Sequence, residues 1–254
     1  MREALPEGVD EAGGEVHVLK ATLAVAPAAL DRCWGSLSAE ERSRAGRFRF
    51  PVHERRFVAA RGLLREILAC LLGRPPAAIA FQYGPHGKPS LAPTSSPGVD
   101  LRFNLSHADE VALYAIAVGR EVGVDVERVR LLPDAEQVAE RFFSPGERAA
   151  LRRLPPRERA AGFFACWTRK EAFLKATGEG LSRPLDSFDV SVPPSESARL
   201  LRVDGDSLAA QRWSLTAIGP APGFAGAVAF EGQASVSCHQ WVVGGEVTGL
   251  LEAR

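Results

Sequence analysis

Residues 122–129 read VGVDVERV and join a buried-strand pattern to a pair of carboxylates. Side chains two residues apart on a strand point to the same face, with their Cα atoms about 7 Å apart. Asp125 and Glu127 therefore share one face, and Val124 and Val126 occupy the other. Because two like charges are costly to bury together, either a cation compensates them or they face water on an edge strand. A pair of carboxylates suits Mg²⁺, which takes its remaining ligands from water and phosphate.

The elements around this stretch follow one order twice, a helix and then several strands. The predicted strands are 15–24, 78–84, 111–119, 122–129, 187–192, 213–219, 224–232 and 236–243. The predicted helices are 37–48, 55–73, 134–154 with a break at Pro145, and 158–181. We expect residues 84–90 to form a turn, and the strands 111–119 and 122–129 to pair as a hairpin.

This order predicts an α+β fold of two pseudo-symmetric lobes. Each lobe is a long helix packed on a small antiparallel sheet, with the active site in the cleft between them. The expected division is a loose leader over residues 1–15, an N-terminal lobe over 16–121 and a C-terminal lobe over 122–254. Because both lobes lie in one chain, we expect a monomer.

Composition argues against several classes of function. Lys and Arg together number 31, as do Asp and Glu, so the formal net charge is zero. No overall field attracts nucleic acid or a membrane surface, and we expect neither as a partner. The four cysteines form no C-x-x-C pair, which argues against a zinc ribbon or a redox motif. With a polar start and no long apolar run, we expect a cytoplasmic protein.

Residues 167–175, WTRKEAFLK, carry a second candidate motif on the predicted helix 158–181. Trp167, Glu171 and Lys175 fall four residues apart and share one stripe. A simple Glu–Lys surface pair is one interpretation. The other is that Glu171 adds a third carboxylate to Asp125 and Glu127, while Lys175 neutralises a phosphate.

Polar residues of the first half supply further candidates. Ser106 and His107 stand side by side, but adjacent residues rarely form a nucleophile–base pair and no G-x-S-x-G elbow surrounds them. The pair could hydrogen-bond a phosphate. The alternative for His107 is a purely structural role. No Walker A or Rossmann glycine pattern is present. The candidate cations, each also readable as a surface charge, are Arg42, Arg44, Arg61 and Lys88.

Four motifs, taken in order, closely resemble the 4′-phosphopantetheinyl transferases of the surfactin-synthetase-activating type. The resemblance covers about residues 37–192, and one departure is Ala108, where many relatives have Ser after Ser-His. Residues 142–147, FFSPGE, also look like the family's F-F-x-x-x-E segment. The four motifs are Gly87-Lys88-Pro89, Asn104-Leu105-Ser106-His107, Gly123-Val124-Asp125-Val126-Glu127, and Trp167-x-x-Lys170-Glu171-Ala172-x-x-Lys175 with Gly178-x-Gly180-Leu181.

The resemblance implies a reaction. Coenzyme A binds between two similar α+β halves, and its 4′-phosphopantetheine arm is transferred to a serine of an apo acyl or peptidyl carrier protein. Adenosine 3′,5′-bisphosphate is released, and Mg²⁺ is required. A non-catalytic carrier-binding relative and a Mg²⁺-dependent phosphohydrolase are the alternatives. We expect carrier docking on residues 134–160, where Arg148, Arg152, Arg153 and Arg157 cluster.

The resemblance also implies roles for individual residues. Asp125, Glu171 and Glu127 are the expected metal ligands, with Glu127 direct or water-mediated. The expected catalytic residues are Glu171, Lys175 and His107. Glu171 either is the base that takes the proton of the carrier serine or orients that base. The expected coenzyme A contacts are Arg61 at the 3′-phosphate, Lys88, Ser106, His107 and Lys175, with Arg44 and Arg42 as weaker candidates.

Overall fold

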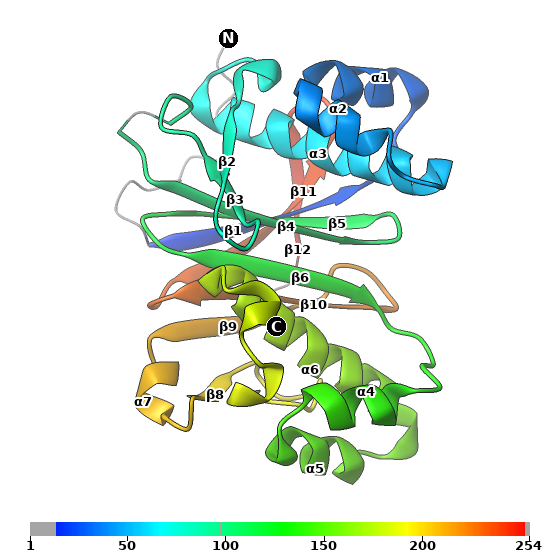
Figure 1. Ribbon diagram of the computed structural model, residues 1–254, viewed down its shortest axis with the longest axis vertical. Helices are drawn as coiled ribbons and strands as arrows, with labels where there is room; N and C mark the ends of the chain where they lie inside the picture. Colours follow the sequence, from blue (N-terminus) through cyan, green and yellow to red (C-terminus); the bar gives the residue numbers. More distant parts are fainter. Residues whose placement is uncertain (1–13, 97, 252–254) are drawn as a thin grey trace.

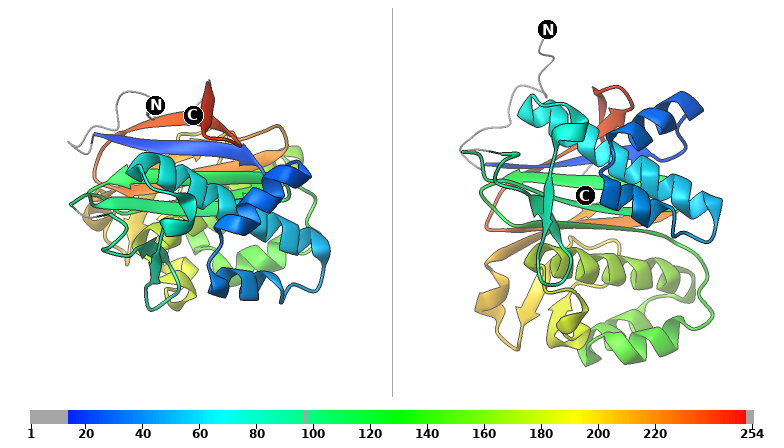
Figure 2. Two further views of the ribbon diagram at one scale, coloured as in Figure 1. Left: turned by 90° about the horizontal axis from the view of Figure 1, so that it is seen from above. Right: turned by 45° about the horizontal axis from the view of Figure 1, so that its top comes forward.

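The computed structural model describes residues 14–96 and 98–251, and it has two main sheets stacked between two groups of helices (Figures 1 and 2). The larger sheet has the strand order β12-β11-β1-β5-β4, and the smaller has the order β6-β10-β9. The larger comprises β12 (Glu246–Leu251), β11 (Ser235–Val242), β1 (Glu15–Thr22), β5 (Val111–Val118) and β4 (Leu101–Ala108). The smaller comprises β6 (Val122–Arg128), β10 (Phe224–Glu231) and β9 (Trp213–Ile218).

Two short strand pairs and several helices complete the fold. The pairs are β2 (Phe81–Tyr83) with β3 (Pro89–Leu91), and β7 (Phe188–Val190) with β8 (Leu200–Val203). The α-helices are α1 (Pro27–Ser36), α2 (Ala39–Ala45), α3 (Pro51–Leu72), α4 (Ala135–Phe142), α5 (Pro145–Arg153), α6 (Pro156–Thr177) and α7 (Ser207–Ala210). The 3₁₀ turns are η1 (Pro76–Ala78), η2 (Gly180–Ser182) and η3 (Leu185–Ser187). Mixed helices and mostly antiparallel sheets confirm the α+β class.

Three hydrophobic cores, counted over the described residues, hold these layers together. The first lies between the larger sheet and helices α1 to α3, and the second between the smaller sheet and helices α4 to α6. The third lies between the two sheets, where Val122, Val124 and Val126 of β6 belong to one cluster with Val16 and Val18 of β1. The valine face of β6 is therefore buried between the sheets, and its other face is left for α6.

The two long helices have the same local design. Each has 22 residues, begins with a proline in its first turn and ends at a glycine in the left-handed region, Gly73 with φ +60° and Gly178 with φ +73°. Proline suits the first turn because its missing N–H has no partner there, and glycine adopts the left-handed conformation without strain. Each is preceded by a short helix with a capping box, Ser38 with Glu41 in α2 and Ser144 with Glu147 in α5.

The predicted hairpin of residues 111–119 and 122–129 is wrong. β5 pairs with β4 and β1, whereas β6 pairs with β10. The partner of β5 is the unpredicted strand β4, which turns back at Asp109 with φ +48°, a conformation that aspartate tolerates. Residues 84–90 contain the expected turn, but β3 already begins at Pro89.

Strands β11 and β12, from the predicted lobe 122–254, belong to the larger sheet. β11 runs parallel to β1, and Val18 pairs with Cys238 in the register. The predicted leader over residues 1–15 lies mostly outside the described residues, and Glu15 already belongs to β1. Within the described part of the chain, every helix is too short or too polar to cross a membrane.

Candidate active site

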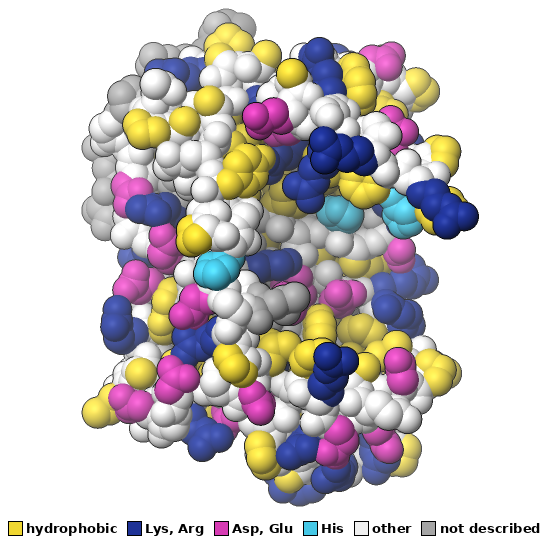
Figure 3. Space-filling view, viewed as in Figure 1, with side chains coloured by type: hydrophobic (Ala, Val, Ile, Leu, Met, Phe, Trp, Pro, Cys, Tyr) yellow, Lys and Arg dark blue, Asp and Glu magenta, His cyan; other side chains and the backbone are white. Residues whose placement is uncertain are grey.

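The centre of the candidate site is the contact between β6 and α6. A Cβ atom added at Gly123 would lie 2.2 Å from the carbonyl oxygen of Ala172 and from the amide nitrogen of Ala176. No other residue leaves room for so close a helix. This contact places Glu171 and Lys175 of α6 beside the carboxylate face of β6. Acidic, basic and histidine side chains lie together near the middle of this face of the molecule (Figure 3).

Asp125, Lys175 and Ser106 form a tight cluster from three elements, β6, α6 and β4. The Lys175 Nζ atom is 2.6 Å from Asp125 Oδ1, and Ser106 Oγ donates to the same oxygen over 2.8 Å. Lys175 also donates to Ser106 Oγ over 3.0 Å. Asp125 is buried, and its second oxygen, Oδ2, has no hydrogen-bond partner among the described residues. A buried carboxylate with an unused oxygen is ready to accept a donor or a cation.

Glu127 and Glu171 feel the charge of Asp125. Partial burial raises the pKa of both carboxyl groups above the usual value, and the negative Asp125 raises each pKa further. The three acidic residues therefore concentrate negative charge in one place, and Lys175 offsets part of it. This is the charge pattern expected around a bound cation.

The acidic residues fit Mg²⁺ by their chemistry. No group of three His, Cys, Asp or Glu side chains among the described residues converges enough to enclose a metal ion. Mg²⁺ does not need such a cage, since it commonly uses one or two carboxylates and takes its other ligands from water and phosphate. The unused Asp125 Oδ2 is an oxygen of the required kind.

His107 lies beside a group of charges from the start of α3. Partial desolvation lowers the pKa of its imidazole, and the nearby cations Arg56 and Lys175 lower it further. Arg56 is mostly buried and donates to Glu110 Oε1 over 3.0 Å. His53 is close enough to lower the pKa of His107 as well. Sequence reasoning missed Arg56 and His53. The run HERR at 53–56, near the helix start, is the pattern that could have drawn attention to them.

Arg61 lies in a buried ion cluster. Only 7% of the residue is exposed, its Nε donates to Glu41 Oε1 over 2.6 Å, and its guanidinium also contacts the Tyr83 hydroxyl. Arg65 binds the other oxygen of Glu41 over 2.8 Å. Arg61 and Arg44 line the same hollow of about 720 Å³. Arg42 lies apart, where it donates to the Gly35 carbonyl over 3.0 Å.

Lys88 joins the β2–β3 turn to the end of α6. Its Nζ is 2.6 Å from Glu121 Oε2 and donates to the Ala176 carbonyl over 2.7 Å. Burial lowers the pKa of the Lys88 amine, and Glu121 counteracts this shift. Ala176 follows Lys175 directly, so Lys88 fixes the backbone beside the Asp125–Lys175 pair.

Trp167 and Lys170 serve the core of the second half. Trp167 stacks with Phe163 at 6.1 Å between ring centroids. Lys170 is fully buried, 2.7 Å from Glu147 Oε1, and donates to the carbonyl of Phe188 over 2.7 Å. In this helix motif, Glu171 and Lys175 therefore face the site, whereas Trp167 and Lys170 hold α6 to its neighbours.

Comparison with known proteins identifies the family. Residues 26–118 match the family "4′-phosphopantetheinyl transferase, N-terminal", and residues 121–229 match the "4′-phosphopantetheinyl transferase superfamily". The chain is 40% identical over 218 residues to 4′-phosphopantetheinyl transferase HetI of Nostoc sp., covering 86% of this chain and 88% of that relative. The chain belongs to the 4′-phosphopantetheinyl transferase superfamily.

Further relatives in this superfamily agree with the resemblance in the motifs. A 4′-phosphopantetheinyl transferase of Bacillus subtilis is 33% identical over 175 residues, covering 69% of this chain and 75% of the relative. The 4′-phosphopantetheinyl transferase Sfp of Bacillus subtilis strain 168 is 30% identical over 160 residues, covering 63% and 68%. The expected family is confirmed.

Proposed function

We propose that this chain transfers the 4′-phosphopantetheine arm of coenzyme A to a serine of an apo acyl or peptidyl carrier protein. The products are the modified carrier and adenosine 3′,5′-bisphosphate. The observation that carries the proposal is the cluster of Asp125, Ser106 and Lys175, joined by Glu127 and Glu171, in a chain of this superfamily. Transfer of this kind depends on positioning and on charge neutralisation, and the cluster supplies groups for both.

We further propose that the site lies in a cleft between two pseudo-symmetric lobes, residues 16–121 and 122–254. The repeated design of a capped short helix followed by a 22-residue helix supports this symmetry. So does the placement of the capping glutamates. Glu41 forms buried ion pairs with arginines of α3, and Glu147 forms one with a lysine of α6. In this proposal β11 and β12 cross from the second lobe to the sheet of the first.

Proton transfer is assigned to α6. Glu171 is proposed to accept the proton of the carrier serine, because its raised pKa makes it a stronger base than an ordinary carboxylate. Lys175 is proposed to bind a phosphate oxygen and to protonate the leaving phosphate. In the structure its ammonium lies against Asp125, at the centre of the charged cluster. Asp125, Glu127 and Glu171 are proposed to hold Mg²⁺, which neutralises phosphate charge when bound.

The proposed coenzyme A contacts other than Lys175 come from the first half of the chain. Ser106 and His107 lie on β4 beside Lys175, which supports their role at the phosphates. We add Arg56, because its charge acts on His107. The Arg61 guanidinium already contacts Glu41 and Tyr83, and we propose that a phosphate approaches it at the hollow that it shares with Arg44. Lys88 is proposed to contact coenzyme A while holding the end of α6.

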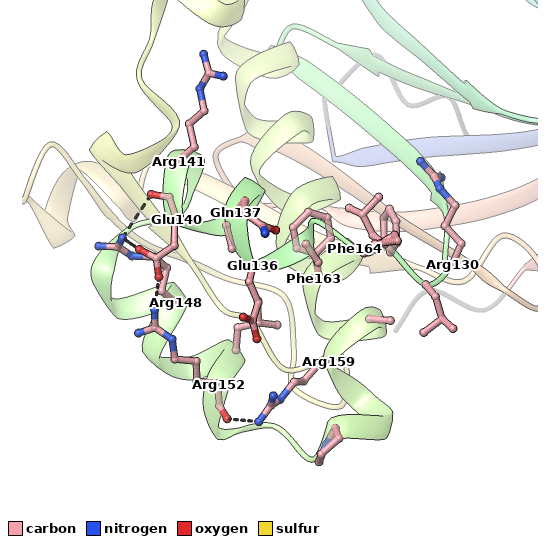
Figure 4. Close-up of a pocket in the computed structure, with 18 residues that line it drawn as sticks. Arg130, Glu136, Gln137, Glu140, Arg141, Arg148, Arg152, Arg159, Phe163 and Phe164 are labelled. Atoms are coloured by element: carbon pink, nitrogen blue, oxygen red, sulfur yellow. Dashed lines mark hydrogen bonds and ion pairs between the residues drawn. The ribbon is translucent and has the colours of Figure 1, made fainter.

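Carrier docking is proposed at a hollow of about 780 Å³ between α4, α5 and α6 (Figure 4). Arg148 and Arg152, two of the arginines expected to dock the carrier, both bind Glu140. Arg157 lies near this hollow with 86% of its side chain exposed, and the side chain of Leu131 on the rim is almost fully exposed. Exposed apolar and cationic groups of this kind suit an acidic carrier surface.

One experiment separates the proposed function from its alternatives. The protein is mixed with coenzyme A, Mg²⁺ and an apo carrier protein, and the carrier is weighed by mass spectrometry. A gain of one phosphopantetheine is expected, and none when the carrier serine is replaced by alanine. Coenzyme A consumed without any carrier indicates a phosphohydrolase instead. Carrier binding without a mass gain indicates a non-catalytic relative. The monomeric state, the cytoplasmic location and the absence of nucleic-acid or membrane partners stay predictions.

A further inference from the structure

Two histidines meet on neighbouring parallel strands, away from the candidate active site. His17 lies on β1 and His239 on β11, and the His17 Nδ1 and His239 Nε2 atoms are 3.4 Å apart. Strand β5 separates β1 from β4, which carries Ser106. Because side chains alternate along a strand, His17 shares the face of Leu19, which packs in the core beneath the N-terminal helices.

The spacing of the two nitrogens suits a shared metal ligand set. In a tetrahedral zinc site with Zn–N bonds of 2.0–2.1 Å, two ligand nitrogens are about 3.4 Å apart. A direct hydrogen bond between the rings is the simpler alternative, but 3.4 Å exceeds the usual donor–acceptor range of about 2.7–3.2 Å. The pair is therefore loosely joined as a hydrogen bond and well spaced for one metal ion.

A carboxylate lies behind the first ring. His17 Nε2, the nitrogen that does not face His239, is 3.6 Å from Glu15 Oε2. It is buried and has no hydrogen-bond partner among the described residues. Histidines that bind metals commonly direct their second N–H toward a carboxylate, which fixes the tautomer and raises the basicity of the ligand nitrogen.

We propose that His17 and His239 together bind one Zn²⁺ or another divalent cation that prefers imidazole nitrogen. Glu15 orients the first ring, and water fills the remaining positions. Since no group of three metal-ligating side chains converges among the described residues, the ion is exchangeable rather than enclosed. It joins strands 222 residues apart in the chain and stabilises the native state by binding only to it.

The test is a zinc titration of the full chain after treatment with a chelator. Mg²⁺ is kept in large excess so that the acidic residues near Asp125 do not compete for zinc. We expect one zinc ion per chain and a rise in Tm of about 5 °C at a hundredfold excess over Kd. In His17→Gln and in His239→Gln the affinity falls at least about tenfold, whereas it is unchanged in His86→Gln, a matched control because His86 is exposed on the turn between β2 and β3.

Two further measurements make the outcome decisive. Co²⁺ in place of Zn²⁺ gives the strong visible absorption of a tetrahedral site in the wild-type chain, and both glutamine variants lose it. If His17→Gln fails to fold, His239→Gln decides, because its ring is only half-buried. Zinc affinity retained in His239→Gln, or lost instead in Asp125→Asn, overturns the proposal.

Discussion

Replacing Gly123 by alanine tests whether the contact of β6 with α6 builds the site. The new Cβ would lie 2.2 Å from backbone atoms of Ala172 and Ala176, so the helix must retreat by about 1 Å. Overpacking of this kind costs about 1–3 kcal/mol in measured cores. A misplacement of about 1 Å at reacting groups lowers a rate by about 100-fold. We therefore expect kcat to fall by about two orders of magnitude, with a smaller loss of stability.

The assay measures both quantities on the same variant. Transfer is followed with an apo carrier at saturating coenzyme A, and Tm is measured by calorimetry, where about 2–4 °C corresponds to 1 kcal/mol in a chain of this size. Gly46→Ala is the matched control, because its new Cβ would meet no atom closer than 3.8 Å. A Gly123→Ala variant with wild-type kcat and wild-type Tm would refute the account of this contact.

Four further predictions concern separate parts of the molecule. Asp125→Ala lowers kcat at least about 100-fold while far-UV circular dichroism stays unchanged; retained turnover excludes Asp125 from the reaction. Glu41→Ala removes the counter-ion of two buried guanidinium groups and lowers the free energy of unfolding by about 3–5 kcal/mol, measured with urea; a loss below about 1 kcal/mol contradicts a buried ion cluster. In the folded chain the pKa of His17 and of His239 is lowered from 6.5, so the unfolded chain binds protons first as the pH falls. The free energy of unfolding of the metal-free chain therefore falls as the pH drops below 6.5. His239→Gln weakens this pH dependence, and an unchanged pH dependence contradicts the assignment. Arg157→Glu raises the KM for the carrier but not for coenzyme A, as steady-state kinetics measure; an unchanged carrier KM places docking elsewhere.

The sequence predicted the long helices and strand β6 well, because their patterns are local. The apolar positions of residues 55–73 recur at helical spacing, and a glycine and a proline end the run, so the predicted helix agrees with Pro51–Leu72. The alternating valines of β6 likewise indicated a strand with one buried face. Strand β4 was missed because Asn104, Ser106 and His107 interrupt its apolar alternation, and the hairpin was then assigned to the wrong neighbour.

The candidate site was predictable only in part. Spacing placed Glu171 and Lys175 on one stripe, and the structure brings Lys175 against Asp125. Spacing could not show that Lys170 is fully buried against Glu147, because that depends on which elements cover α6. Nor could the spacing indicate whether Arg56 or Arg61 lies closer to His107. Both are cations on one helix, and only the fold places Arg56 near His107 and Arg61 against Glu41.

The parallel pairing of β1 with β11 also bears on synthesis of the chain. While residues 16–121 emerge from the ribosome, β1 has β5 on one side but waits for β11 on the other. Pairings so distant in sequence form slowly, and an open strand edge invites association with other chains. The open edge of β1 therefore leaves the nascent chain prone to aggregation until residues 235–242 have been made, and a chain stalled before them is expected to depend on chaperones.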